Sequence, residues 1–264
     1  MTRSRLPALY VSHGSPMLVL DNSAAKDFLS GFGEELGRPE AIVVASAHFE
    51  TETPSLSADE RPAMIYDFGG FPRALYEMTY PAPGDPLLAQ RAAAMLTDAG
   101  LPTRTVTNRG FDHGAWVPLK LLYPEADIPI VEISVQPHAG ALHHVALGRA
   151  LAPLREEGVL LMGSGSLTHN LSQLPRYGRD PNAPAPDWVS QFGDWANERI
   201  AAGDLDAIAD YRERAPFARE NHPTEEHFLP LPFAIGAGGD GARGKRVHSS
   251  HQYGILMMDA YAFD

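Results

Sequence analysis

The stretch AIVVASAHF at residues 41–49 runs through small and apolar side chains and then reaches a histidine. An uninterrupted apolar run of this kind is typical of a strand buried on both faces, as in a parallel sheet covered by helices. Similar runs occur at residues 7–11, 128–135 and 158–162. Together with residues 41–47, these runs predict the central strands of one sheet.

Helical patterns lie between the apolar runs. Residues 23–36, 85–99 and 141–154 each place apolar side chains three and four positions apart, and Gly37 and Gly100 follow the first two segments as stop signals. Alternation of buried strands with amphipathic helices indicates an α/β fold. We expect one three-layer α/β/α domain with a central, largely parallel or mixed sheet.

The rest of the chain fits the same domain. Residues 175–186 (PRYGRDPNAPAP) predict a polar, proline-rich loop, which is followed by a last helical region at 187–211. Residues 245–248 and 253–262 can supply closing strands. No internal repeat or linker divides the chain, so residues 1–264 are expected to form a single domain.

The sequence does not contain a complete nucleotide-binding motif or the serine-nucleophile motif of α/β hydrolases. The glycines of residues 236–241 satisfy GxGxxG, but the following ARGKRVH opens no amphipathic helix, so a flexible loop is expected there. Residues 239–245 match the glycines and the lysine of a phosphate-binding loop. The motif then requires a Ser or Thr that binds magnesium, and this chain has Arg246 at that position. The sequence has no GxSxG, which argues against a serine hydrolase of the α/β type.

The amino-acid composition limits which metals, macromolecules and small molecules the protein can be expected to bind. The 264 residues include no cysteine, so the ligands of any metal must be His, Asp or Glu. A chain of this length buries enough surface to fold without a structural metal, and any metal should therefore be functional. The formal net charge of −12 is not that of a protein binding nucleic acid or an anionic membrane. A small-molecule partner and, without a secretion signal or spanning segment, a cytoplasmic location are expected.

Three of the eleven histidines follow buried strands. His13 comes after ALYVS, His48 after AIVVASA, and His169 after GVLLMG and the expected turn at residues 163–166. Ligands of open α/β sheets bind beyond the carboxyl ends of the strands, so these imidazoles should converge if the strands are neighbours. Convergence of three imidazoles suggests a divalent metal.

Other histidines lie away from these strand ends. His113 in GFDHGAW is one candidate, and the segment ENHPTEEHFLPL offers His222 and His227 together with Glu225 and Glu226. Either nitrogen or oxygen from this segment could complete a set of ligands on one face of a metal. Solvated helix or loop positions are expected for the remaining five: His138, His143, His144, His248 and His251.

Six motifs now resemble a known family. They are HGSP (13–16), SAHF (46–49), YDFGGFPRALYEMTYPAPG (66–84), GFDHGAW (110–116), GSGSLTHNL (163–171) and HPTEEHFLPL (222–231). In this order, and over nearly the whole chain, they resemble the extradiol ring-cleavage dioxygenases of the LigB superfamily, and within it the DOPA 4,5-dioxygenase branch. The resemblance implies cleavage of the ring of a catechol, such as a DOPA-like one, with O₂.

The resemblance also assigns residues to a mononuclear non-haem metal site. Fe²⁺ is the expected working metal, and Zn²⁺ suits the same imidazoles. By resemblance, the metal ligands are His13, His48 and His227, with Glu226 in reserve for the last. His169 is implied as the active-site histidine beside the metal, and it can exchange a proton during ring opening. His113 is implied to support the metal ligands or to bind substrate.

Two alternatives remain at this point. The same ligands could serve a zinc hydrolase that activates water and needs no O₂. A non-enzymatic interaction protein, as in the Memo branch of the superfamily, is the other alternative, although the full set of five histidines argues against it. For the dioxygenase, we expect flat apolar side chains around the catechol ring, with Phe49, Phe71 and Trp116 as candidates.

Overall fold

The computed structural model describes residues 5–177, 180 and 183–264, and its centre is an eight-stranded mixed sheet in the order β4-β3-β5-β2-β6-β1-β10-β7. The four apolar runs form β1, β2, β5 and β6, and the pairs β1–β6, β2–β6 and β2–β5 are parallel. A separate two-stranded ribbon joins β8 and β9. The strands are β1 (Ala8–Ser12), β2 (Ala41–Glu50), β3 (Ser55–Ser57), β4 (Arg104–Val106), β5 (Ile130–Val135), β6 (Val159–Gly165), β7 (Gly244–His248), β8 (His251–Gln252), β9 (Leu256–Met257) and β10 (Ala260–Phe263).

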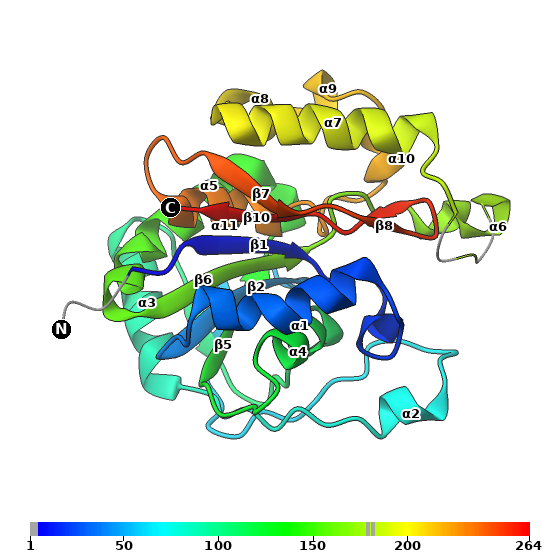
Figure 1. The fold of residues 1–264 in the computed structure, drawn as a ribbon. Coiled ribbons are helices and arrows are strands. Elements are labelled where there is room, and N and C mark those ends of the chain that lie inside the picture. Colours follow the sequence, from blue (N-terminus) through cyan, green and yellow to red (C-terminus); the bar gives the residue numbers. More distant parts are fainter. Residues whose placement is uncertain (1–4, 178–179, 181–182) are drawn as a thin grey trace.

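Helices cover both faces of this sheet (Figure 1). The α-helices are α1 (Ala24–Leu36), α2 (Arg73–Tyr76), α3 (Pro86–Asp98), α4 (His113–Leu122), α5 (Gly140–Leu151), α6 (Leu174–Tyr177), α7 (Asp187–Ala202), α8 (Leu205–Ala209), α9 (Tyr211–Arg214), α10 (Ala218–Asn221) and α11 (Pro230–Gly238). Short 3-10 helices are η1 (Pro16–Val19), η2 (Pro137–Ala139), η3 (Ala152–Glu157) and η4 (Leu171–Gln173). Among the described residues, no helix is both long and apolar enough to cross a bilayer.

Two hydrophobic cores lie on opposite faces of the sheet. Along β2, Ile42 and Val44 join α1 and α4 in one core, whereas Val43 and Ala45 join α3, α5, α7 and α11 in the other. This alternation follows from the two-residue period of a strand and explains why residues 41–45 of β2 are apolar at every position. The expected three-layer α/β/α fold with a mixed sheet is confirmed.

The sheet extends further toward the site than expected. The strand expected at 158–162 continues through Gly165, so most of the expected turn at 163–166 belongs to β6. A Cβ on Gly163 would lie 2.0 Å from the carbonyl oxygen of Pro230, and one on Gly165 would lie 2.2 Å from that of His227. Glycine is needed at both positions because the chain around α11 packs directly on β6.

The expected loop at residues 236–241 is wrong in its first half, because residues 236–238 end the buried helix α11. A Cβ on Gly236 would lie 2.0 Å from the carbonyl oxygen of Val145 in α5, so these glycines let two helices approach closely. The helical region expected at 187–211 is divided where Gly203, with φ of +69°, ends α7. Of the loop expected at 175–186, residues 175–177 belong to α6, and residues 178–179 and 181–182 lie outside the described residues.

Candidate active site

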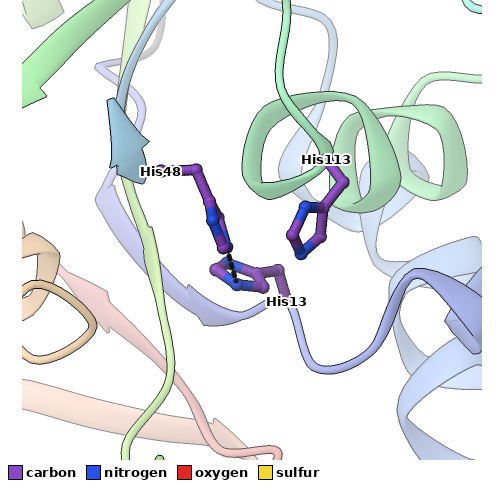
Figure 2. A group of neighbouring side chains, drawn as sticks. All are labelled: His13, His48 and His113. Carbon is purple, nitrogen blue, oxygen red and sulfur yellow. Dashed lines mark hydrogen bonds between the residues drawn. The ribbon is translucent and has the colours of Figure 1, made fainter. Parts of the chain in front are cut away.

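Five predicted histidines meet at the carboxyl ends of the central strands. β2, β6 and β1 are parallel neighbours, so His48 near the end of β2, His13 after β1 and His169 after β6 reach the same edge. His113 is the first residue of α4, and His227 precedes α11. Figure 2 shows the rings of His13, His48 and His113 turned toward one another. Neighbouring ring centroids are 5.0 Å apart for His13–His48, 4.0 Å for His48–His113, 5.4 Å for His13–His227, 4.9 Å for His48–His227 and 3.5 Å for His169–His227.

The hydrogen bonds of buried His13 fix which of its ring nitrogens carries the hydrogen. Its Nδ1 lies 3.1 Å from the Ser164 hydroxyl, which itself donates to the carbonyl oxygen of Gly114. Because the hydroxyl hydrogen is already used, His13 must donate from Nδ1. Its Nε2 is left as a bare acceptor, 3.2 Å from Nε2 of His48.

One carboxylate orients two of the other rings. Nδ1 of His48 lies 3.3 Å from one oxygen of Asp67, and Nδ1 of His113 lies 2.9 Å from the other. Although burial alone would raise the pKa of Asp67, its hydrogen bond and charge interactions with His113 and His48 lower that pKa to about 2. An ionised carboxylate only accepts hydrogen bonds, so both imidazoles donate from Nδ1, and Nε2 is the unprotonated nitrogen of each ring in its neutral form.

The fourth and fifth rings form a stacked pair. Nδ1 of His227 lies 2.9 Å from a carboxylate oxygen of Glu226, and its buried Nε2 has no hydrogen-bond partner. His169 stacks on His227 with an angle of 9° between the ring planes. Within the described chain, neither ring nitrogen of His169 has a protein partner, whereas its backbone N–H donates to the carbonyl oxygen of Asn221.

Burial keeps four of these imidazoles, those of His13, His48, His169 and His227, neutral. It lowers the pKa of His48 to about 3 and that of His169 to about 4, with a further contribution to each from His113. The pKa values of His13 and His227 fall well below the ordinary 6.5 because of burial and the neighbouring imidazoles. Neutral imidazoles with free Nε2 atoms are metal ligands, whereas protonated ones are not.

The donor set fits a divalent cation. Bare Nε2 atoms of His13 and His48 facing each other, and the unpartnered Nε2 of His227, are unfavourable arrangements that a cation between them would satisfy. Candidate ligand atoms lie within 4.8 Å of one another in two groups. The first group pairs His13 and His48 with His113 instead of the expected third ligand His227. The second contains His169, Glu226 and His227.

A buried network of charged side chains packs against the group formed by His13, His48 and His113. Asp112 accepts from the hydroxyl of Ser46, two residues before His48, and from the backbone N–H of Ala115, so it caps α4 at His113. Arg109 pairs with Asp112 at 2.5 Å and lies 3.6 Å from Glu132 of β5. Burial raises the pKa of both carboxyls, and for Glu132 the nearby Asp112 raises it further.

Among the described residues, none of the three aromatic side chains expected at the site makes a ring contact with a site histidine. Phe49 lies under the Arg109 guanidinium at 4.5 Å, Trp116 is fully buried, and Phe71 packs on Phe68. Among the described residues, the aromatic contact with a site histidine comes from Phe68, which meets His113 edge to face at 5.7 Å. Phe68 was not singled out from the sequence because nothing in its spacing places it beside a strand end.

Two histidines outside the site are also buried. His144 was expected to be solvated, but its ring donates to the carbonyl oxygen of Gly140 and accepts from the backbone N–H of Gln136. His222 donates to the carbonyl oxygen of Leu167 and is not part of either ligand group. Burial lowers the pKa of each to about 3. Both serve the packing of the fold.

Comparisons with known proteins place the whole chain in one family. Residues 7–263 match the family described as the catalytic LigB subunit of aromatic ring-opening dioxygenase. The chain is 43% identical to a 4,5-DOPA dioxygenase extradiol of Beta vulgaris, covering 96% of this chain and 95% of the relative. It is 41% identical to one of Escherichia coli K12, covering 90% and 87%. A crystal structure of an uncharacterized E. coli K12 protein superposes with a TM-score of 0.80 at 34% identity, covering 98% of this chain and all of that one.

These matches confirm the resemblance found in the sequence, and they favour neither the hydrolase nor the non-enzymatic alternative. The chain belongs to the LigB family of catalytic, aromatic ring-opening dioxygenases, within its extradiol DOPA-dioxygenase branch.

Proposed function

We propose that residues 1–264 act as one catalytic domain that opens the ring of a DOPA-like catechol with O₂, using Fe²⁺ as the working metal. The observation that carries the proposal is the cluster of imidazoles at the strand ends, in which the Nδ1 atoms of His13, His48, His113 and His227 have hydrogen-bonding or ion-pair partners, so that Nε2 is left to bind a metal or substrate. The substrate class is supported by relatives named for 4,5-DOPA.

His13, His48 and His227 are the proposed metal ligands. Each has an acceptor at Nδ1 and therefore offers Nε2, and each ring centroid is within 5.4 Å of the other two. When bound there, a divalent metal would acidify the catechol hydroxyls and leave open positions for bidentate substrate and O₂. Zn²⁺ suits the same nitrogens, so purified protein can carry it.

His169 and His113 are the proposed proton-handling residues. His169 has no protein partner at either ring nitrogen among the described residues, so it is free to take a hydroxyl proton and return it during ring opening. His113 presents Nε2 as an acceptor for the other catechol hydroxyl. Phe68, which meets His113 edge to face, is the proposed apolar contact for the catechol ring.

The test is an aerobic and an anaerobic incubation of Fe²⁺-loaded protein with L-DOPA, dopamine and unsubstituted catechol. We expect a yellow ring-opened semialdehyde only when O₂ is present. Activity of Zn²⁺-loaded protein toward an ester or amide, independent of O₂, would instead support the hydrolase. Absence of O₂ uptake with every catechol would contradict the proposal.

A further inference from the structure

Asp67 lies between two histidines of the site but comes from neither the sheet nor α4. Its Oδ2 lies 3.3 Å from Nδ1 of His48, and its Oδ1 lies 2.9 Å from Nδ1 of His113. The same Oδ1 also accepts the backbone N–H of His113 at 3.1 Å. Both oxygens are therefore committed to site histidines, and Oδ1 is held by two donors.

The segment carrying Asp67 is fixed by several independent contacts. Met64 pairs with Phe111 in a parallel bridge, and the backbone N–H of Ile65 donates to Phe111. The indole N–H of Trp116 donates to the carbonyl oxygen of Ile65, and the hydroxyl of Tyr66 donates to Met78. Because these bonds hold the three residues directly before Asp67, the position of its carboxylate does not depend on the histidines alone.

A neutral imidazole can carry its hydrogen on either nitrogen, and the partner of one nitrogen decides the state of the other. If Nε2 carried the hydrogen, it would point an N–H toward the site and could not bind a metal there. The Asp67 carboxylate removes this choice for two rings together.

We propose that Asp67 is a positioning residue that locks His48 and His113 in the Nδ1–H tautomer, so that both present an unprotonated Nε2 to the site. The use of those two Nε2 atoms rests on the proposed function, with His48 as a metal ligand and His113 as a substrate contact. Asp67 itself touches neither metal nor substrate.

Asparagine at this position makes a specific, asymmetric prediction. In Asp67→Asn, the amide oxygen is fixed on the His113 side, because two N–H groups donate to that atom. The amide NH₂ then faces His48, whose Nδ1 must become the acceptor, and the hydrogen moves to Nε2. Asp67→Ala removes the constraint without imposing the wrong tautomer, so it should damage metal binding less than Asp67→Asn.

The first measurement is the tautomer of each ring in metal-free protein at neutral pH, by two-bond ¹H–¹⁵N correlation, with signals assigned from His48→Gln and His113→Gln. We expect Nδ1–H for both rings in the wild type, and Nε2–H for His48 alone in Asp67→Asn. The second is Zn²⁺ affinity, which should fall roughly 10- to 100-fold in Asp67→Asn and less in Asp67→Ala. Glu77→Gln removes one negative charge from the exposed ion pair with Arg73 and should leave the affinity unchanged.

Nε2–H on His48 in the wild type would overturn the proposal, as would wild-type tautomers and Zn²⁺ affinity in Asp67→Asn. The wild-type spectrum, assigned with the two histidine variants, tests the proposal even if the Asp67 variants fail to fold. Nδ1–H on both rings in a protein that opens no catechol would support this role of Asp67 while refuting the proposed function, so the two failures are distinguishable.

Discussion

Replacing His169 by alanine should separate proton transfer from metal binding. The ring of His169 stacks on His227 at 3.5 Å and makes no hydrogen bond to the described protein through its nitrogens. Its removal costs one stacked pair, worth about 1 kcal/mol, or a fall of about 2–4 °C in Tm for a chain of this size. The proposed ligand His227 keeps its bond to Glu226.

The expected loss therefore falls on turnover. His169→Ala should retain its metal and lower kcat by roughly two to four orders of magnitude, the usual contribution of a positioned acid or base. His13→Ala should lose the metal itself, because His13 offers a bare Nε2 at the centre of the cluster. Bound metal, measured by elemental analysis on the same samples used for O₂ uptake, distinguishes the two variants.

The exposed His138 provides the matched control, and His138→Ala should keep both metal and turnover. Loss of metal from His169→Ala as complete as from His13→Ala would refute the assigned role. His169 would then be a ligand, and His113 would be left to move the protons. Undiminished turnover in His169→Ala would refute the role equally.

Two further predictions concern stability. Burial holds the pKa of His144 and His222 at about 3 instead of 6.5, so the unfolded chain binds protons that the native state excludes, and stability should fall as the pH drops below 6.5. By about pH 5 each should cost roughly 2 kcal/mol relative to neutral pH, measured by urea unfolding, and an unchanged free energy of unfolding would contradict this. Gly165→Ala would place a Cβ 2.2 Å from the carbonyl oxygen of His227, so it should destabilise the protein by roughly 1–3 kcal/mol and weaken Zn²⁺ binding. Gly31→Ala has open space around the new methyl group and should cost nothing, whereas equal effects of the two substitutions would show that the close approach is unimportant.

The strand ends could be predicted because each apolar run stops at a polar residue. His13 and His48 follow such runs directly, and parallel neighbours bring their carboxyl ends to one edge. His169 lies four residues beyond β6 and reaches the same edge. The absence of a side chain at Gly165 lets the chain at His227, just before α11, pack on the end of β6. The position of His144 could also have been read correctly, because Ala141, Leu147 and Leu151 lie three positions before, three after and seven after it on one apolar helix face, and all three are buried.

Other elements could not be predicted from periodicity. α11 is buried all round and contains Pro230 and Pro232, so it has no amphipathic pattern and carries residues that usually mark a turn. α4 is likewise apolar on nearly every face and has Pro118 in its interior. In both cases tertiary burial on all sides outweighs the local signals that identify a surface helix.

The carboxylate that orients two of the site histidines also could not be predicted from the sequence. Asp67 lies between β3 and α2 in a segment without regular structure, and tertiary contacts such as the pairing of Met64 with Phe111 hold that segment beside the site. No spacing rule connects Asp67 to His48 or His113. A carboxylate that orients ligands from a distant loop becomes visible only when the fold is known.

Isotopically labelled O₂ tests most directly whether this histidine cluster performs extradiol cleavage. Fe²⁺-loaded protein would be given L-DOPA under labelled O₂, with O₂ consumption recorded and the product analysed by mass spectrometry. We expect one O₂ consumed per catechol, a semialdehyde formed by cleavage beside the diol, and label retained in its new carboxylate. The same incubation with His13→Ala should give neither uptake nor product. A product cleaved between the two hydroxyl-bearing carbons, a carboxylate labelled from water, or full activity in His13→Ala would contradict extradiol cleavage at this site.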